Sequence, residues 1–332
     1  MFKKILAAVI TLAFAFPMVT QAAPPIVIKF SHVVATNTPK GQAADYFKKI
    51  AEERTKGRVK VEVYPNSQLY KDKEEMEALQ MGSVQMLAPS LAKFAPLGLK
   101  EFELFDLPFI FDDYKELHAV TQGPVGAKLL KSLETKGLIG LAYWDNGFKV
   151  MSANKPLKTV ADMKGQKMRI QSSKVLDSQM RSVGAIPQVL AFSEVYQALQ
   201  TGVVDGTENP PSNLYTQKMH EVQKYVTVSN HGYLGYAVLV NKKFWMGLPA
   251  NIRTTLETAM KDSTAYANSV AKKDNDDAMA GVKKSGKSQI ITLTAQEKAA
   301  WRKAMDKTHK DNMGRIGADV INEVYSATGY KL

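Results

Sequence analysis

One arginine has surroundings that suggest binding chemistry. Arg169 lies in the segment 167–171 (KMRIQ), where apolar and polar residues alternate as in a half-buried strand. Arg169 and Gln171 then share one face of the strand, and Met168 and Ile170 share the other. A buried guanidinium needs a negative partner, and its planar fork matches a carboxylate in two-point contact. The segment predicts a carboxylate-binding arginine or, as the alternative, an internal salt bridge to an Asp or Glu.

Residues of the types that act in catalysis are not arranged in known catalytic motifs in this sequence. The sequence has no nucleophile elbow, no phosphate-binding glycine loop and no dinucleotide fingerprint. Its five histidines are scattered, and none pairs with another at the spacing of a metal site. The absence of cysteine excludes disulfides, thiolate metal ligands and cysteine catalysis. We predict that the protein is not an enzyme and uses no metal or cofactor, with a secreted hydrolase or lyase as the alternative.

The elements that must position Arg169 alternate between strands and helices. In the first part of the chain, strands are predicted at 26–30, 59–63 and 84–88, and helices from Thr38-Pro39 to Gly57 and at about 72–81. This order implies a parallel, helix-covered sheet that binds ligands at the carboxyl ends of its strands. Further on, the patterns predict strands within 137–154 and at 168–171, a strand and turn at 203–206, and helices at 193–201, at about 249–281 and after a capping box at 294–297.

The N-terminus has the features of a secretory signal peptide. Lys3 and Lys4 precede an apolar run at 5–16, and small residues lead up to Ala22. The run is shorter than the roughly 20 residues that a membrane span requires. We expect residues 1–22 to be cleaved, which leaves a periplasmic protein that does not itself span the membrane.

The net charge is basic, formally +12 over 332 residues. A basic chain can bind nucleic acid, an anionic membrane or small anions, or it can simply carry a lysine-rich solvated surface. The export signal and the lack of basic runs with interleaved aromatic residues argue against nucleic acid. We attribute most of the charge to the solvated surface and leave a small anionic ligand as the functional interpretation.

Four segments of the chain, taken in order, point to a known family. They are 30–34 (FSHVV), 63–69 (VYPNSQL), 191–202 (AFSEVYQALQTG) and 204–210 (VDGTENP). Over essentially the whole mature chain, they resemble the solute-binding subunit of TRAP transporters (tripartite ATP-independent periplasmic transporters). Segments 86–94, 105–109 and 229–232 are similar to the DctP-type branch, whose typical ligands are malate, succinate and fumarate.

The resemblance implies a fold and a division of the chain. The fold would be α/β, a two-lobed periplasmic-binding-protein clamp with mixed, mostly parallel sheets and one long helix that spans both lobes. The first lobe would contain residues 24–146 and 236–274, and the second 147–235 and 275–332.

The resemblance also implies roles for individual residues. Arg169 would form the family's salt bridge with a ligand carboxylate, and Asn209 would hydrogen-bond the same group. Phe192 would be a wall of the pocket, while Lys149 and Lys93 fall where the family often places further cations. The other predicted lining residues are Ser90, Gln171, His231, Tyr236 and His32.

Most of these residues also have a purely structural interpretation. Phe192 could belong to the core, and the two lysines could be solvated surface residues. The histidines could be satisfied loop residues, and Asn209 could cap the turn before Pro210.

The resemblance finally implies what the protein does and with which partners. It would be a monomer that captures a small carboxylate, with a C4-dicarboxylate as the first choice. It would pass this ligand to the membrane permease subunits of a TRAP transporter. The same clamp holding an aromatic, keto or sugar acid is the alternative within the binding class.

Overall fold

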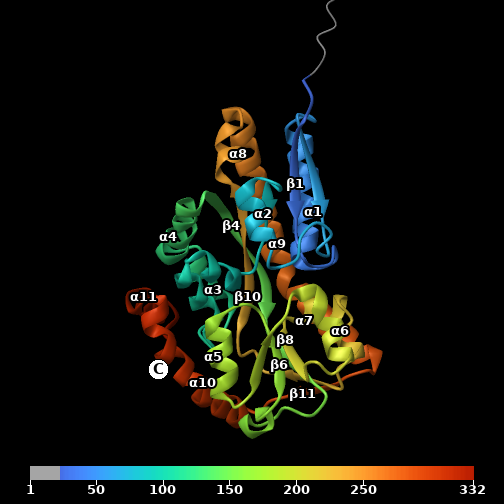
Figure 1. Ribbon diagram of the computed structural model, residues 1–332, viewed down its shortest axis with the longest axis vertical. Coiled ribbons are helices and arrows are strands. Elements are labelled where there is room, and N and C mark those ends of the chain that lie inside the picture. Colours follow the sequence, from blue (N-terminus) through green and yellow to red (C-terminus); the bar gives the residue numbers. More distant parts are fainter. Residues whose placement is uncertain (1–22) are drawn as a thin grey trace, which may run out of the picture.

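The computed structural model describes residues 23–332, so the predicted signal peptide at 1–22 lies outside the described residues. These residues form an elongated body with one β-sheet in its upper half and one in its lower half (Figure 1). Helices cover both sheets, and each sheet mixes parallel and antiparallel pairs. The predicted α/β class with mixed sheets is therefore confirmed.

The first sheet has the strand order β2-β1-β3-β10-β4. Its strands are β1 (Ile26–Ser31), β2 (Val59–Tyr64), β3 (Met86–Leu87), β4 (Leu138–Phe148) and β10 (Tyr233–Asn241). The first three pair in parallel, as the alternating pattern predicts, and β10 runs antiparallel between β3 and β4. Helix α1 (Pro39–Arg54) begins at the predicted cap, because the Thr38 hydroxyl accepts a hydrogen bond from the Gly41 amide.

Helix α2 (Glu75–Met81) begins three residues later than the predicted start at about residue 72. The reason lies in Asp72, whose side chain does not cap the helix. Its carboxylate instead accepts hydrogen bonds from the Lys93 ammonium and, at 2.6 Å, from the Phe192 amide. The helix start is therefore displaced by a contact with a distant segment.

The second sheet has the strand order β11-β9-β5-β8-β6-β7. Its strands are β5 (Val150–Ala153), β6 (Lys167–Ile170), β7 (Ile186–Val189), β8 (Gly206–Asn209), β9 (Tyr225–Val228) and β11 (Gln289–Thr292). Of the strand and turn predicted at 203–206, the strand part is wrong, because the strand only begins at Gly206. The turn before it is held by Asp205, whose carboxylate accepts a 2.8 Å hydrogen bond from the Lys167 amide.

Helix α9 (Ala250–Ser285) connects the two halves of the molecule, as the predicted long helix should. It packs on α1 and β4 beside the first sheet and on α7 (Pro211–Thr216) beside the second. In Figure 1 it runs behind both sheets along the long axis.

The other helices complete the two covering layers. They are α3 (Tyr114–Thr121), α4 (Pro124–Ser132), α5 (Lys174–Ser182), α6 (Val195–Gln200), α8 (Lys242–Gly247), α10 (Ala295–Ile316) and α11 (Ala318–Thr328). The predicted capping box at Thr294 and Glu297 starts α10.

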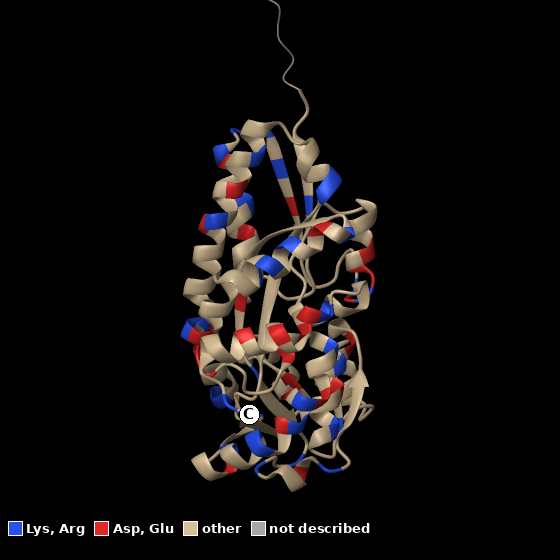
Figure 2. Ribbon diagram, turned by 90° about the vertical axis from the view of Figure 1, so that its left-hand side faces the viewer, with Lys and Arg blue, Asp and Glu red and all other residues tan. Residues whose placement is uncertain are grey.

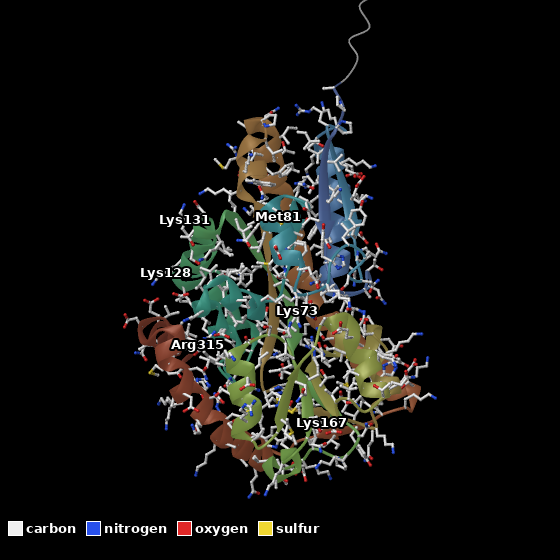
Figure 3. All side chains as sticks on the ribbon, viewed as in Figure 1. Lys73, Met81, Lys128, Lys131, Lys167 and Arg315 are labelled. Atoms are coloured by element: carbon white, nitrogen blue, oxygen red, sulfur yellow. The ribbon has the colours of Figure 1, made fainter. Side chains whose placement is uncertain are left out.

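The C-terminal helices contact both halves. Helix α10 packs against α5, whereas α11 packs against α3 and α4 beside the first sheet. Val320, Ile321 and Val324 of α11 join the hydrophobic core of that first half. Arg315, labelled in Figure 3, adds an ion pair to the buried Glu103 of the short helix 100–106. The predicted division into lobes, with 275–332 assigned wholly to the second, stays a prediction.

Charged residues of both signs are spread over the surface of both halves (Figure 2). Several lysines pair with aspartates one turn away on exposed helix faces, as Lys272 does with Asp276. This mixture agrees with the interpretation of the basic charge as a solvated surface. Among the described helices, none combines the length and the apolar character needed to cross a membrane.

Candidate functional site

A small cavity lies where elements of the two sheets meet. It is lined by Val33, Val34, Lys40, Asp72, Ser90, Lys93, Gln171, Phe192, Asn209, Asn213, Leu234 and Tyr236. Six of the ten predicted site residues are among them: Ser90, Lys93, Gln171, Phe192, Asn209 and Tyr236.

The second sheet supplies one wall of the cavity from the ends of neighbouring strands. Asn209 ends β8, and Arg169 lies on the adjacent strand β6. Phe192 follows β7 at the start of a short helix. Because β6, β7 and β8 run parallel, their carboxyl ends meet at one edge of the sheet, where α/β folds bind ligands.

Arg169 is buried beside the cavity, with 2% of its surface exposed. Its Nε and Nη2 donate to the carbonyl oxygen of Leu190 at 3.0 and 2.8 Å. Nη2 also lies 3.9 Å from Asp72 Oδ2, and the guanidinium lies 6.0 Å from the centre of the Phe192 ring. Arg169 itself is not part of the cavity lining, and within residues 23–332 these contacts leave its Nη1 without a hydrogen-bond partner.

Lys93 lines the cavity but already has two carboxylate partners. Its ammonium forms ion pairs with Asp72 and, at 2.7 Å, with Glu75. The nearby Lys93 and Arg169 hold the pKa of Asp72 at about 2 against the opposing effect of burial. Asp72 is therefore ionised and ties the loop before α2 to Lys93 and to the Phe192 amide.

Two side-chain hydrogen bonds complete the polar lining. Gln171 donates from Nε2 to the Ser90 hydroxyl at 2.6 Å, which joins the end of β6 to the segment after β3. The Tyr236 hydroxyl accepts from Nδ2 of Asn146 at 2.7 Å. Asn213, also in the lining, keeps a buried Oδ1 with no partner in the described part of the chain, so it retains hydrogen-bonding capacity for a ligand.

Lys149 and His231 lie away from the cavity, in a buried group of their own. Lys149 Nζ is 2.7 Å from Glu208 Oε1, and His231 Nε2 is 2.8 Å from Glu208 Oε2. Burial raises the pKa of Glu208, but Lys149 and His231 outweigh it and bring that pKa down to about 2. His231 therefore donates through Nε2 to the carboxylate, and its Nδ1 accepts from Ser229 at 2.7 Å. The structure does not bring either residue to the cavity.

His32, predicted at the mouth of the cleft, is instead completely buried after β1. It is not part of the cavity wall. Burial, helped by the charge of Lys40, lowers the pKa of His32 to about 3, so the ring is neutral at ordinary pH.

The structure adds three polar cavity residues that sequence reasoning missed, Lys40, Asp72 and Asn213, and, away from the cavity, Glu208 as the partner of Lys149 and His231. Lys40 had a usable signal, because it occupies the first turn of a predicted helix, where a cation is electrostatically unfavourable. Asp72 and Glu208 gave no such signal, since their partners lie more than twenty residues away.

A groove adjoins the cavity and shares Asp72, Lys93 and Gln171 with it. Lys73, labelled in Figure 3, and the partly exposed Val189 also line this groove. The groove therefore leads from the cavity toward the surface. Among the described residues, no three His, Asp or Glu side chains are grouped to hold a metal ion.

Comparisons with known proteins agree with this geometry. Residues 30–315 match the family described as bacterial extracellular solute-binding protein, family 7, or DctP. The chain belongs to this family. It is 63% identical to the C4-dicarboxylate-binding periplasmic protein DctP of Rhodobacter capsulatus, over 97% of this chain and 96% of that protein. The resemblance inferred from the motifs is confirmed.

Solved structures of family 7 proteins show the same architecture. A TRAP periplasmic solute-binding protein from Sulfurospirillum deleyianum, with bound succinate, is 48% identical and has a TM-score of 0.89, over 92% of this chain and all of that one. Another from Pseudomonas aeruginosa, with bound L-malate, is 46% identical and has a TM-score of 0.85, over 86% of this chain and all of that one. The predicted clamp fold is therefore confirmed.

Proposed function

We propose that this family 7 protein captures a C4-dicarboxylate such as succinate, malate or fumarate in the periplasm and delivers it, chemically unchanged, to the permease subunits of a TRAP transporter. The observation that carries the proposal is the polar cavity between the two sheets, with Asn209 in its wall and the Arg169 fork beside it. The names of the relatives support the ligand class, since those proteins bind C4-dicarboxylates.

In this proposal Arg169 and Asn209 hold one carboxylate of the ligand. The free Nη1 of Arg169 donates charge-assisted hydrogen bonds, which strengthen when the closing cavity excludes water. Asp72 and the Leu190 carbonyl keep the guanidinium in position before the ligand arrives. The ligand stabilises the closed arrangement only by the contacts it makes better there than in an open one.

Isothermal titration calorimetry with succinate, L-malate, fumarate and a panel of keto, aromatic and sugar acids tests the proposal. We expect the C4-dicarboxylates to bind most tightly, and the ligand recovered after incubation to be chemically unchanged. Preference for another acid class would overturn the ligand assignment, and turnover of a bound ligand would overturn the assignment as a binding protein.

The variant Arg169→Ala tests the role of the arginine. We expect it to weaken succinate binding by about 3 kcal/mol or more, because a carboxylate in the closed cavity would lose its charged partner. The matched control is Arg181→Ala, since Arg181 is exposed and pairs only with Asp177 on its own helix. Equal affinity of the Arg169 variant and the control would remove Arg169 from the site.

A further inference from the structure

Lys40 is a buried lysine in the cavity wall whose ammonium has no carboxylate partner. Only 1% of its surface is exposed. Its Nζ donates to the carbonyl oxygen of Ala88 at 2.9 Å and lies 3.8 Å from the centre of the Tyr236 ring. Within residues 23–332 it makes no ion pair, whereas Lys93 in the same cavity makes two.

This arrangement is unfavourable unless an anion completes it. A buried ammonium is costly without a charged partner, and one carbonyl and one aromatic ring compensate only in part. Lys40 also occupies the first turn of α1, where the helix dipole already carries positive partial charge. The Lys40 ammonium and the N-terminus of α1 therefore both contribute positive charge at the cavity.

The neighbouring charges are already compensated by one another. Asp72 and Glu75 both pair with Lys93, and Asp72 also faces Arg169. Lys40 comes from α1 beside the first sheet, while Arg169 and Asn209 come from strands of the second sheet. Lys40 and Asn209 therefore line the same cavity from elements beside different sheets, so a ligand held through Asn209 and Arg169 can contact Lys40 as well.

We infer that Lys40 binds the second carboxylate of the ligand and takes up a proton as it does so. The inference rests on the proposed function and deepens it, since it names the group that distinguishes a dicarboxylate from a monocarboxylate. Lys149, the cation predicted for this role, is occupied by Glu208 away from the cavity.

The proton uptake follows from the environment of Lys40 in the cavity wall. Burial lowers its pKa to about 7; Lys93 adds to this, while Glu75 and Asp72 oppose it. Three other titratable groups face the site with pKa values of about 3 (His32), about 2 (Asp72) and about 12 (Tyr236). Burial raises the pKa of Glu75, and its two carboxylate partners raise the pKa of Lys93. A ligand carboxylate beside Nζ would favour the charged ammonium and raise its pKa again.

Calorimetry of succinate binding in buffers of different ionisation enthalpy measures this uptake directly in the wild-type protein. Because burial lowers the pKa of Lys40 to about 7 in the free protein, we expect clearly more proton uptake per ligand at pH 8 than at pH 6. The same small uptake at both pH values would overturn the inference.

Three variants separate Lys40 from a merely structural role. Succinamate, in which an amide replaces one carboxylate of succinate, serves as the isosteric probe. We expect Lys40→Met to weaken succinate binding about 10- to 100-fold, to leave succinamate binding within about threefold and to abolish proton uptake at pH 8. Lys40→Arg should keep the preference for succinate without proton uptake, because arginine stays charged. Lys49→Met, at an exposed position of the same helix, is the matched control and should change nothing.

Each alternative outcome has a distinct meaning. Equal losses of succinate and succinamate in Lys40→Met would show that Lys40 shapes the cavity without reading the second carboxylate, which overturns the inference. Unchanged succinate affinity in that variant would overturn it as well. A wild-type protein that binds succinamate and succinate equally would refute the second-carboxylate site, whereas one that binds neither would refute the proposed function itself.

Discussion

The buried ion pair between Lys149 and Glu208 allows a prediction that separates a structural role from a ligand-binding one. Both side chains are only 2% exposed, and the ammonium lies 2.7 Å from the carboxylate. The change Lys149→Met keeps most of the volume of the side chain but leaves the Glu208 carboxylate with His231 as its remaining partner. Breaking a buried pair in this way costs about 3–5 kcal/mol of unfolding free energy.

Urea unfolding followed by far-UV circular dichroism measures this cost. We expect Lys149→Met to lower the unfolding free energy by about 3–5 kcal/mol and the double variant Lys149→Met/Glu208→Gln to recover much of the loss, because no unpaired charge then remains. The control Lys272→Met removes an exposed pair and should change stability by less than about 0.5 kcal/mol.

The ligand-binding interpretation of Lys149 makes the opposite forecast. If Lys149 contacts the second carboxylate, Lys149→Met should abolish the preference for succinate over succinamate while stability stays within about 0.5 kcal/mol of wild type. That pair of results would refute the structural assignment made here.

Two further changes test other buried polar groups. Burial raises the pKa of Asp106 to about 7, well above its value in the unfolded chain, so the free energy of unfolding should fall as pH rises from about 4 to 7. The variant Asp106→Asn should lose this pH dependence and be more stable than wild type at pH 8. Urea unfolding at pH 5 and at pH 8 measures both effects. The variant Asn275→Ala should lower the free energy of unfolding by about 2 kcal/mol, because Asn275 donates to the Asn146 carbonyl at 2.7 Å and accepts from the Ser212 amide at 2.9 Å. An unchanged midpoint of thermal unfolding would contradict this.

The order of elements could be predicted because the local signals agree with the final fold. Thr38 and Pro39 start α1, and the capping box at Thr294 starts α10, since both signals act within one helical turn. Val203 misled the prediction of a strand at 203–206. It is β-branched, but 55% of its surface is exposed and it belongs to a turn whose Asp205 carboxylate accepts a hydrogen bond from the Lys167 amide of β6.

The site could be predicted only in part, for a related reason. Arg169 could be predicted because polar and apolar residues alternate on its strand and because the family resemblance, carried by motifs elsewhere in the chain, implies a ligand-binding arginine there. Lys93 and Lys149 have similar local sequences to many surface lysines, and only long-range pairing reveals that one faces Asp72 in the cavity and the other faces Glu208 outside it. To predict that Lys40 lies in the site, the unfavourable position of a positive charge at a helix start has to be given more weight than the general expectation that a lysine is solvated.

The interleaving of the chain between the two sheets has a consequence for the time at which the protein can fold. The first sheet is incomplete until β10 fits between β3 and β4, and its core still lacks Ile321 and Val324 at that point. Contacts between residues far apart in the sequence therefore complete the first half of the molecule, and a chain that depends on such contacts is expected to fold more slowly than one built from local contacts.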